Sequence, residues 1–421
     1  MNKNVELSSK LGDLLNVPPI SIELLPGNPS EWLASAPPEH APFLFVDNHL
    51  GVPHKLAYKA YLAAVARFRA VRPRHRATDC PDSTEVLTSS AVLLLVNPAH
   101  QTALNTRKRL VLLGVHPASH ELRFTDALLT LRDGAKQSIV WHHRRWLLRH
   151  IHPLLPASAS DSHSPAPRSP GWGDGVDTLN DVALPPDAFL AEIAAVERAC
   201  EAYPRNYHAW AHRYLCAEAL VLSASASSPH GGLQAARELE EERARIRTWV
   251  ERHVADYSAM QYACRLEVLL RGRPGVDGSG SGSGVHALAL VRAYPSHEAL
   301  WLYLRGAVAL GLFCPPEARE TARAAVDVDE LAEQHLTRTF EGKGGEGATA
   351  GSQPVNEARA HAVRFAAWRA WLREGRGIDG TLMRKIAAAA EGEVTVTSEG
   401  ALLSYLSAGD AKVVEKRTRS V

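Results

Sequence analysis

The amino-acid sequence predicts an all-α fold in which antiparallel helix pairs stack as a solenoid. Nearly every periodic stretch places apolar residues three and four positions apart, the pattern of a helix with one buried face. Proline, glycine and Asn-Pro interrupt these stretches at short intervals, as expected where neighbouring helices run antiparallel. Alternating strand patterns are almost absent, and "EVTVTSEG" (393–400) is the only brief candidate.

The helices with the clearest apolar periodicity are short to medium in length. A further helix, "SIVWHHRRWLLRHI" (138–151), concentrates two tryptophans, three arginines and several histidines. The other clear stretches cover residues 57–71, 83–96, 189–203, 233–254 and 297–313.

Composition excludes several classes of function. The chain has 421 residues with 47 Lys+Arg against 46 Asp+Glu, so its near-zero net charge gives no reason to expect a nucleic-acid partner. Five scattered cysteines fit reduced thiols better than a disulfide framework or a zinc site. No apolar run is long enough for a membrane span, and the N-terminus lacks an apolar signal core. We therefore expect a cytoplasmic protein without stable membrane insertion.

Three polar segments divide the helical pattern. They are rich in Ser, Gly, Pro and Asp and cover residues 156–186, 277–284 and 341–354. Because helical patterns resume after each one, we interpret them as disordered inserts within one helical-repeat domain, residues 43–391. Residues 1–42 are then an N-terminal extension, and residues 392–421 a C-terminal tail.

An internal repeat explains the helix at 138–151. Trp141 and Trp210 are each followed by x-His-Arg, so Arg144 and Arg213 stand three residues after a tryptophan. Related units give the five anchor positions Leu104, Trp141, Trp210, Met260 and Trp301, with Arg107 and Arg305 as further arginines. The steps between anchors are 37, 69, 50 and 41 residues. Removing the polar insert of about 30 residues from the second step restores the period of a helix pair, which favours a solenoid.

Each repeat places an aromatic residue and an arginine on one helix face. The indole can pack while the guanidinium reaches along the surface. His142 and His143 are about 100° apart around the helix, so the pair cannot hold one metal ion without distortion. For these histidines a packing or interface role is favoured, and no metal site is predicted. The pair Arg144–Arg145 is compatible both with a solvated face and with a surface for a partner or an anion.

The tandem N-x-x-x-W-x-x-R units resemble the repeats of protein prenyltransferase alpha subunits, with "VWHHRRWLL" (140–148) and "NYHAWAHR" (206–213) as the strongest matches. "FVDNHLGVP" (45–53) and "SSAVLLLVNPAHQTALNTRKRL" (89–110) resemble more closely one branch, the repeat-containing proteins that act as alpha-type subunit of the third geranylgeranyltransferase. The resemblance covers residues 43–312. It implies a right-handed α-α superhelix that wraps around a separate beta subunit.

The resemblance also implies where the chemistry lies. In this family zinc and the isoprenoid pocket belong to the beta subunit, so no cofactor is expected in this chain. Lys136, five residues before Trp141, occupies the position of the family's diphosphate-proximal lysine, although a plain surface lysine is an equal alternative. The family's tyrosine two residues later is replaced by Ser138. The remaining residues expected on the rim that faces the active site are His142, His143, Arg144, Asn206, Tyr207, His208, His212 and Arg213.

These observations predict an alpha-type subunit of a heterodimeric protein prenyltransferase. With its beta subunit it would transfer a geranylgeranyl (or farnesyl) group from an isoprenoid diphosphate to a cysteine of a protein substrate. The alternative is a helical-repeat scaffold without catalytic function. A tetratricopeptide adaptor is disfavoured, because that repeat is nearer 34 residues and lacks the Trp-x-x-Arg pattern.

Overall fold

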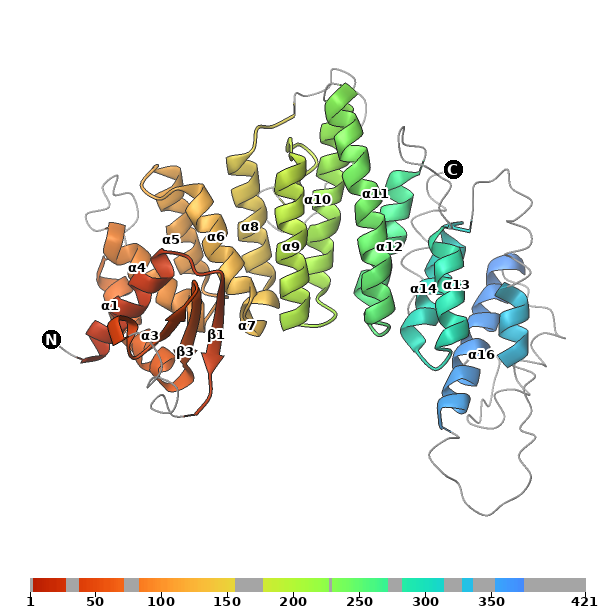
Figure 1. The fold of residues 1–421 in the computed structure, drawn as a ribbon, viewed down its shortest axis with the longest axis horizontal. Helices are drawn as coiled ribbons and strands as arrows, with labels where there is room; N and C mark the ends of the chain where they lie inside the picture. The colour runs from red at the N-terminus through yellow and green to blue at the C-terminus, as the bar shows by residue number, and fades with distance from the viewer. Residues whose placement is uncertain are drawn as a thin grey trace, which may run out of the picture. The chain divides into compact units, whose positions relative to one another are not determined.

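The computed structural model describes most of the helical part of the chain, in two compact units, residues 1–242 and 243–421. The described residues are 3–27, 38–71, 83–155, 177–226, 229–271, 282–313, 328–335 and 353–374. Helices dominate both units (Figure 1), so the predicted all-α repeat fold is confirmed. The strand candidate at 393–400 and the predicted C-terminal tail lie outside the described residues.

The N-terminal unit begins with a first helix and a small sheet, which the sequence analysis did not predict, and continues with the two helices expected at 57–71 and 83–96. Its first elements are α1 (Lys3–Asn16), β1 (Ser21–Leu25), η1 (Pro38–His40), β2 (Leu44–Val46), β3 (His49–Pro53), α3 (His54–Val71) and α4 (Ser83–Val96). The strand order is β1-β3-β2, with β1 parallel and β2 antiparallel to β3. Asp47 and Asn48 have φ angles of 49° and 62°, as in a two-residue type I′ hairpin turn. Such short strands escape a search for long alternating patterns.

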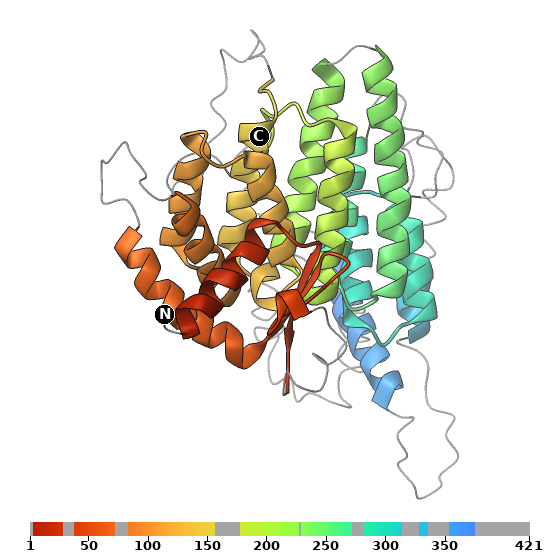
Figure 2. The same cartoon turned by 60° about the vertical axis from the view of Figure 1, so that its left-hand side comes forward.

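Residues 1–42 are not merely an extension, because their described parts belong to the core. Leu11 and Leu15 of α1 are fully buried in one apolar cluster with Leu50 of β3. A Cβ atom on Gly12 would collide with Thr88 of α4, so glycine is what permits the close approach of α1 and α4. Figure 2 turns this region forward and shows α1 beside the sheet. The predicted boundary at residue 42 is therefore wrong.

The rest of this unit consists of helices that alternate in direction. They are α5 (Gln101–Leu112), α6 (Ala118–Leu129), α7 (Arg132–Ala135), α8 (Ser138–Ile151), α9 (Pro186–Ala202), α10 (Tyr207–Ala226) and the first part of α11 (Pro229–Arg252). Helix α6 packs against α8 and α9, and α9 packs against α10 (Figure 1). The antiparallel pairs expected from the short connections are thus present.

The second unit continues with the end of α11, α12 (Tyr257–Leu270), α13 (Ser283–Ala293), α14 (Glu298–Ala309), a helical segment at 328–335 and α16 (Gln353–Glu374). Helix α14 packs against α12, α13 and α16. The Trp301 ring lies 5.5 Å from the Phe365 ring, and the Arg305 guanidinium lies 4.9 Å from the Trp368 ring centre. The fifth repeat unit therefore packs against α16, which lies beyond the predicted repeats.

All five predicted anchors occupy the same position in their helices. Leu104, Trp141, Trp210, Met260 and Trp301 are each the fourth residue of α5, α8, α10, α12 and α14. Each anchor is buried, with at most 3% of its surface exposed. The register predicted from the sequence is therefore that of the structure, including the degenerate fourth unit.

The predicted inserts extend too far toward their C-terminal ends. Residues 177–184 pack against α8 and α10, with Leu179, Val182 and Leu184 buried and a β-bridge between Leu154 and Val182. In the second insert, Ser283 and Gly284 already belong to α13 and are buried. Apart from the first residues of α16, the third insert lies outside the described residues, as do 156–176 and 277–281.

Candidate functional site

Three buried ion pairs connect consecutive helix pairs of the N-terminal unit. Each joins the arginine three residues after an anchor to a glutamate on the next helix along the chain. The pairs are Arg107–Glu121, Arg144–Glu192 and Arg213–Glu242, which we call the buried Arg–Glu ladder. All six side chains are at most 1% exposed. Because charge-assisted bidentate contacts are the strongest kind of hydrogen bond, the ladder fixes one helix pair on the next.

The geometry of the ladder repeats closely. Arg144 donates from Nε and Nη2 to the two carboxylate oxygens of Glu192 at 2.5 and 2.7 Å. Arg213 donates in the same way to Glu242 at 2.6 and 2.8 Å. Arg107 Nε lies 3.0 and 2.9 Å from the oxygens of Glu121. The repeat is therefore defined by charge as well as by its anchors.

A histidine completes each of the first two pairs. His143 Nε2 lies 2.8 Å from Glu121, and His212 Nε2 lies 2.8 Å from Glu192. Burial lowers the pKa of both histidines, although the facing carboxylates oppose it. Both Nδ1 atoms are buried without a hydrogen-bond partner in the described structure. A protonated imidazolium would bury an Nδ1–H donor without an acceptor. We therefore infer that each ring is neutral and donates from Nε2.

The glutamates stay ionised inside the protein. Burial alone would raise the pKa of Glu192, but the Arg144 guanidinium and the hydrogen bond from His212 lower it to about 2. The pKa of Glu121 is likewise lowered well below its usual value, because Arg107 and its two histidine contacts outweigh burial. Each of these two sites thus combines a charged arginine, a charged glutamate and a neutral histidine, and at the second site Asp126 also pairs with Arg144 at 2.9 Å.

The ladder corrects part of the predicted rim. His143, Arg144, His212 and Arg213 were expected to face a partner or solvent, but all four are buried within the unit. The sequence does contain a signal for this arrangement. Each glutamate lies 18 to 20 residues before the following anchor, within an amphipathic helix such as "FLAEIAAVERAC". A carboxylate on an otherwise apolar helix face predicts a buried basic partner.

Asn206, also predicted on the rim, serves a structural purpose. Its side-chain amide donates to the carbonyl oxygen of Ala135 at 2.8 Å, and its side-chain oxygen accepts from the backbone of Ala209 at 3.2 Å. The first contact links two repeats, and the second caps the start of α10. Trp141 Nε1 donates to the same Ala135 carbonyl at 2.8 Å. Trp301 repeats this contact with Pro295 at 2.7 Å.

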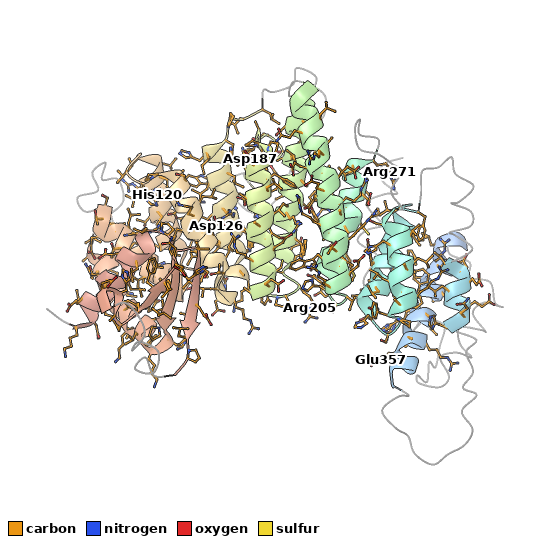
Figure 3. All side chains as sticks on the ribbon, viewed as in Figure 1. His120, Asp126, Asp187, Arg205, Arg271 and Glu357 are labelled. Carbon is orange, nitrogen blue, oxygen red and sulfur yellow. The ribbon has the colours of Figure 1, made fainter. Side chains whose placement is uncertain are left out.

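Lys136 and Tyr207 remain accessible at one end of these helices. Lys136 follows α7 directly, its side chain is 43% exposed, and its ammonium lies 2.7 Å from Asp133. Tyr207 is 62% exposed. Because Ala135 and Asn206 are hydrogen-bonded, Lys136 and Tyr207 flank one contact between repeats. We call Lys136, Asp133 and Tyr207 the α7–α10 edge. Figure 3 labels Arg205 at this end of α9 and Asp187 at the other.

The remaining two predicted rim residues lie near the 177–184 segment. Asp177 bonds His142 at 3.2 Å and also contacts Arg145. The hydrogen bond from His142, followed by the charge of Arg145, lowers the pKa of Asp177 to about 2. Burial and Arg145 lower the pKa of His208. These histidines therefore border a packed segment of the chain itself.

One cluster has the composition of a metal or nucleophile site. Donor atoms of Glu192, His212 and Cys216 lie within 4.8 Å of one another, all buried. However, Arg144 already binds the Glu192 carboxylate through two hydrogen bonds. His212 uses the same nitrogen toward Glu192 and Cys216, so it cannot relay a proton between them. Burial raises the pKa of Cys216 and keeps it a thiol. These contacts favour a packing role.

Stacked helix pairs with anchors at one register and a buried arginine define a helical-repeat protein. The family model "Protein prenyltransferase alpha subunit repeat" matches residues 189–220, which are most of α9 and α10. The chain is thus similar to this family where the third predicted unit lies, and the predicted resemblance is confirmed. In the described residues, no helix combines the length and apolarity needed to cross a membrane.

Relatives that match longer stretches share one description. The chain is 24% identical over 295 residues to Protein prenyltransferase alpha subunit repeat-containing protein 1 of Danio rerio, covering 63% of each chain. It is 30% identical over 182 residues to the Xenopus laevis protein 1-A, covering 42% of this chain and 36% of that protein. It is 26% identical over 178 residues to the Homo sapiens protein 1, covering 42% of this chain and 38% of that protein. The chain thus matches less than two thirds of the length of each relative.

Proposed function

We propose that this chain is the alpha-type subunit of a heterodimeric protein prenyltransferase of the cytoplasm. A zinc-bearing beta subunit would bind the isoprenoid diphosphate, and a protein cysteine would receive a geranylgeranyl or farnesyl group. The observation that supports this proposal best is the common register of the five anchors, together with the repeat match on α9 and α10. This chain then contributes a surface for the beta subunit.

The α7–α10 edge supplies the residues suited to the reaction. As the prenyl group leaves, negative charge develops on the diphosphate, and a fixed ammonium nearby stabilises it. Lys136 is accessible and held at a defined place by the contact of Ala135 with Asn206. Its ion pair with Asp133 is exposed, so the diphosphate can compete for the ammonium at little cost. Tyr207 offers a hydroxyl on the same edge.

A scaffold without catalytic function is the second candidate. Four predicted rim residues are buried in the ladder, and Ser138 stands where the family has tyrosine. The burial of the four leaves Lys136 and His142, with side chains 43% and 37% exposed, as the more accessible basic residues of the predicted rim in the described structure. The scaffold would keep the partner surface and lack transfer activity.

Reconstitution separates the two candidates. The chain is co-expressed with a candidate beta subunit, and transfer of labelled geranylgeranyl from its diphosphate to a cysteine-containing protein is measured, with farnesyl diphosphate in parallel. The proposal expects zinc-dependent transfer by the heterodimer and none by this chain alone. A stable heterodimer without transfer from either diphosphate supports the scaffold and contradicts the enzyme. Failure to form any heterodimer contradicts the proposed partner.

A further inference from the structure

A cavity of about 430 Å³ opens beside the small sheet of the N-terminal unit. It lies between β1, the start of α3, the end of α4 and the turn from α6 to α7. Its floor is apolar and includes Ile22, Ala57, Leu95 and Leu131. We call it the β1 groove. Its volume falls in the range of small-ligand sites, so it can hold one large side chain with adjoining backbone.

The backbone of β1 faces this groove. The Ile22 N–H donates to the Thr130 hydroxyl at 2.9 Å, and that hydroxyl lies 3.2 Å from the Ile22 carbonyl oxygen. Ile22 therefore directs both backbone groups away from β3, and by strand alternation Leu24 does the same. In the described residues, no group outside the sheet bonds Leu24. Figure 1 shows β1 on the α7 side of β3.

The open edge is one residue long. The Thr130 hydroxyl already binds the outward-facing backbone of Ile22. Pro26, which follows the strand, has no N–H to donate. The chain thus offers one donor and one acceptor, both from Leu24, directly beside an apolar cavity. Main-chain pairing at a sheet edge combined with a side-chain pocket is how strand-adding domains recognise extended peptides.

The charges of the groove restrict the peptide further. Two carboxylates line the groove, the exposed Glu23 of β1 and Asp133, and Asp133 is paired with Lys136. Arg132 is exposed, lies 5.9 Å from the Tyr203 ring, and has no carboxylate partner among the described residues. An acidic residue is the complement of this guanidinium.

We propose that the β1 groove binds an extended segment of a partner polypeptide. One aliphatic residue of that segment pairs with Leu24 through two backbone hydrogen bonds and fills the cavity. An acidic residue two positions further on, whose side chain points to the same face of the added strand, binds Arg132. The groove shares Asp133 with the α7–α10 edge but does not depend on the proposed prenyl transfer, and its test measures binding alone.

The experiment titrates the full chain into a fluorescently labelled peptide, acetyl-Thr-Val-Leu-Thr-Asp-Val-amide, and follows anisotropy. A matched peptide with an N-methyl group on leucine keeps every side chain and loses the strand hydrogen bond. We expect saturable binding of the first peptide and at least about tenfold weaker binding of the second. Hydrogen exchange of residues 20–27 should slow only with the first. No saturable binding, or equal binding of both peptides, overturns the proposal.

A charge exchange tests the acidic residue. Arg132→Glu should weaken binding of the aspartate peptide about tenfold and restore binding of the same peptide with lysine in place of aspartate. Arg69→Glu makes the same charge change on the exposed C-terminal end of α3, about 22 Å along that helix from His54 in the groove, and should leave both affinities unchanged. Equal loss in both variants, or no exchange of preference, contradicts the assigned contact.

Discussion

The Arg144 guanidinium and the Glu192 carboxylate form a bidentate ion pair between adjacent helix pairs, and each side chain is only 1% exposed. Removing two charges from water is costly, and their attraction repays that cost only when the geometry is good. Since buried pairs often add little net stability, we propose that these pairs select one arrangement of the helices over others. In a repeat protein, where a helix pair could slide by one turn, three such pairs specify the register.

Glu192→Ala should lower the free energy of unfolding by up to about 3–5 kcal/mol, because the buried Arg144 loses its bidentate partner and keeps only the ion pair with Asp126 at 2.9 Å. Urea unfolding followed by circular dichroism measures this change. Removing both charges with Arg144→Met and Glu192→Leu should recover most of the loss. As a control, Glu241→Ala breaks the exposed pair with Arg237 and should cost less than about 0.5 kcal/mol. Equal costs for the two glutamates would contradict the ladder.

Trp141→Ala and Trp210→Ala should each cost about 3–5 kcal/mol, because both side chains are buried anchors. Asn206→Ala should cost less, about 1–2 kcal/mol, since it removes a helix cap and one link to Ala135. Thermal or urea unfolding of the three variants gives the ranking. An unchanged melting temperature for Trp210→Ala would show that the two tryptophans are not equivalent.

The sequence predicted the helices and their register because anchors recur within apolar patterns of period 3.6. It did not predict the sheet, since strands of three to five residues at the N-terminus give too few alternations to recognise. The available signal in the sequence was the pair Asp47–Asn48, because these residue types tolerate the positive φ angles that both adopt in the hairpin turn.

Charged residues were the other source of error. Arg144 and Arg213 were placed at the surface because their partners lie 48 and 29 residues away, so the signal for the pairing, a carboxylate on an apolar helix face, stands in a different helix. The 177–184 segment is polar in composition, yet Asp177 and Asp181 bind Arg145 and Arg149 of α8. Composition alone therefore led us to include the ordered segment 177–184 in a predicted disordered insert.

Stability should fall in acid from about pH 6.5 downward, well before the glutamates titrate. The folded state keeps His143 and His212 neutral, with pKa values below the ordinary 6.5. Below pH 6.5 these histidines bind protons in the unfolded chain but not in the folded one. The free energy of unfolding then falls by up to about 1.4 kcal/mol per pH unit for each histidine. Glu192, with a pKa of about 2, adds its loss only as pH falls below the ordinary 4.5. Urea unfolding at pH 7.5, 6.0 and 5.0 measures the slope.

The double variant His143→Gln with His212→Gln should flatten that slope between pH 6.5 and 5.0. Glutamine offers an amide donor near the position of Nε2 and does not titrate. His150→Gln changes an exposed histidine on the same helix and should leave the slope as it is. A double variant with the full wild-type slope would assign the acid sensitivity to other groups.

Lys136→Ala should lower turnover of the reconstituted heterodimer by about tenfold, equivalent to roughly 1.4 kcal/mol in the barrier, and leave heterodimer formation intact. The reason is that one ammonium contact with the leaving diphosphate is lost in the transition state, while no buried interface area changes. Asp133→Asn frees Lys136 from its ion pair and should not reduce turnover. Lys59→Ala, on the exposed face of α3, is the matched control and should have no effect. Single-turnover transfer of labelled geranylgeranyl measures the chemical step directly. If Lys136→Ala retains full turnover in an intact heterodimer, Lys136 is a surface lysine and the charge of the diphosphate is neutralised entirely by other groups.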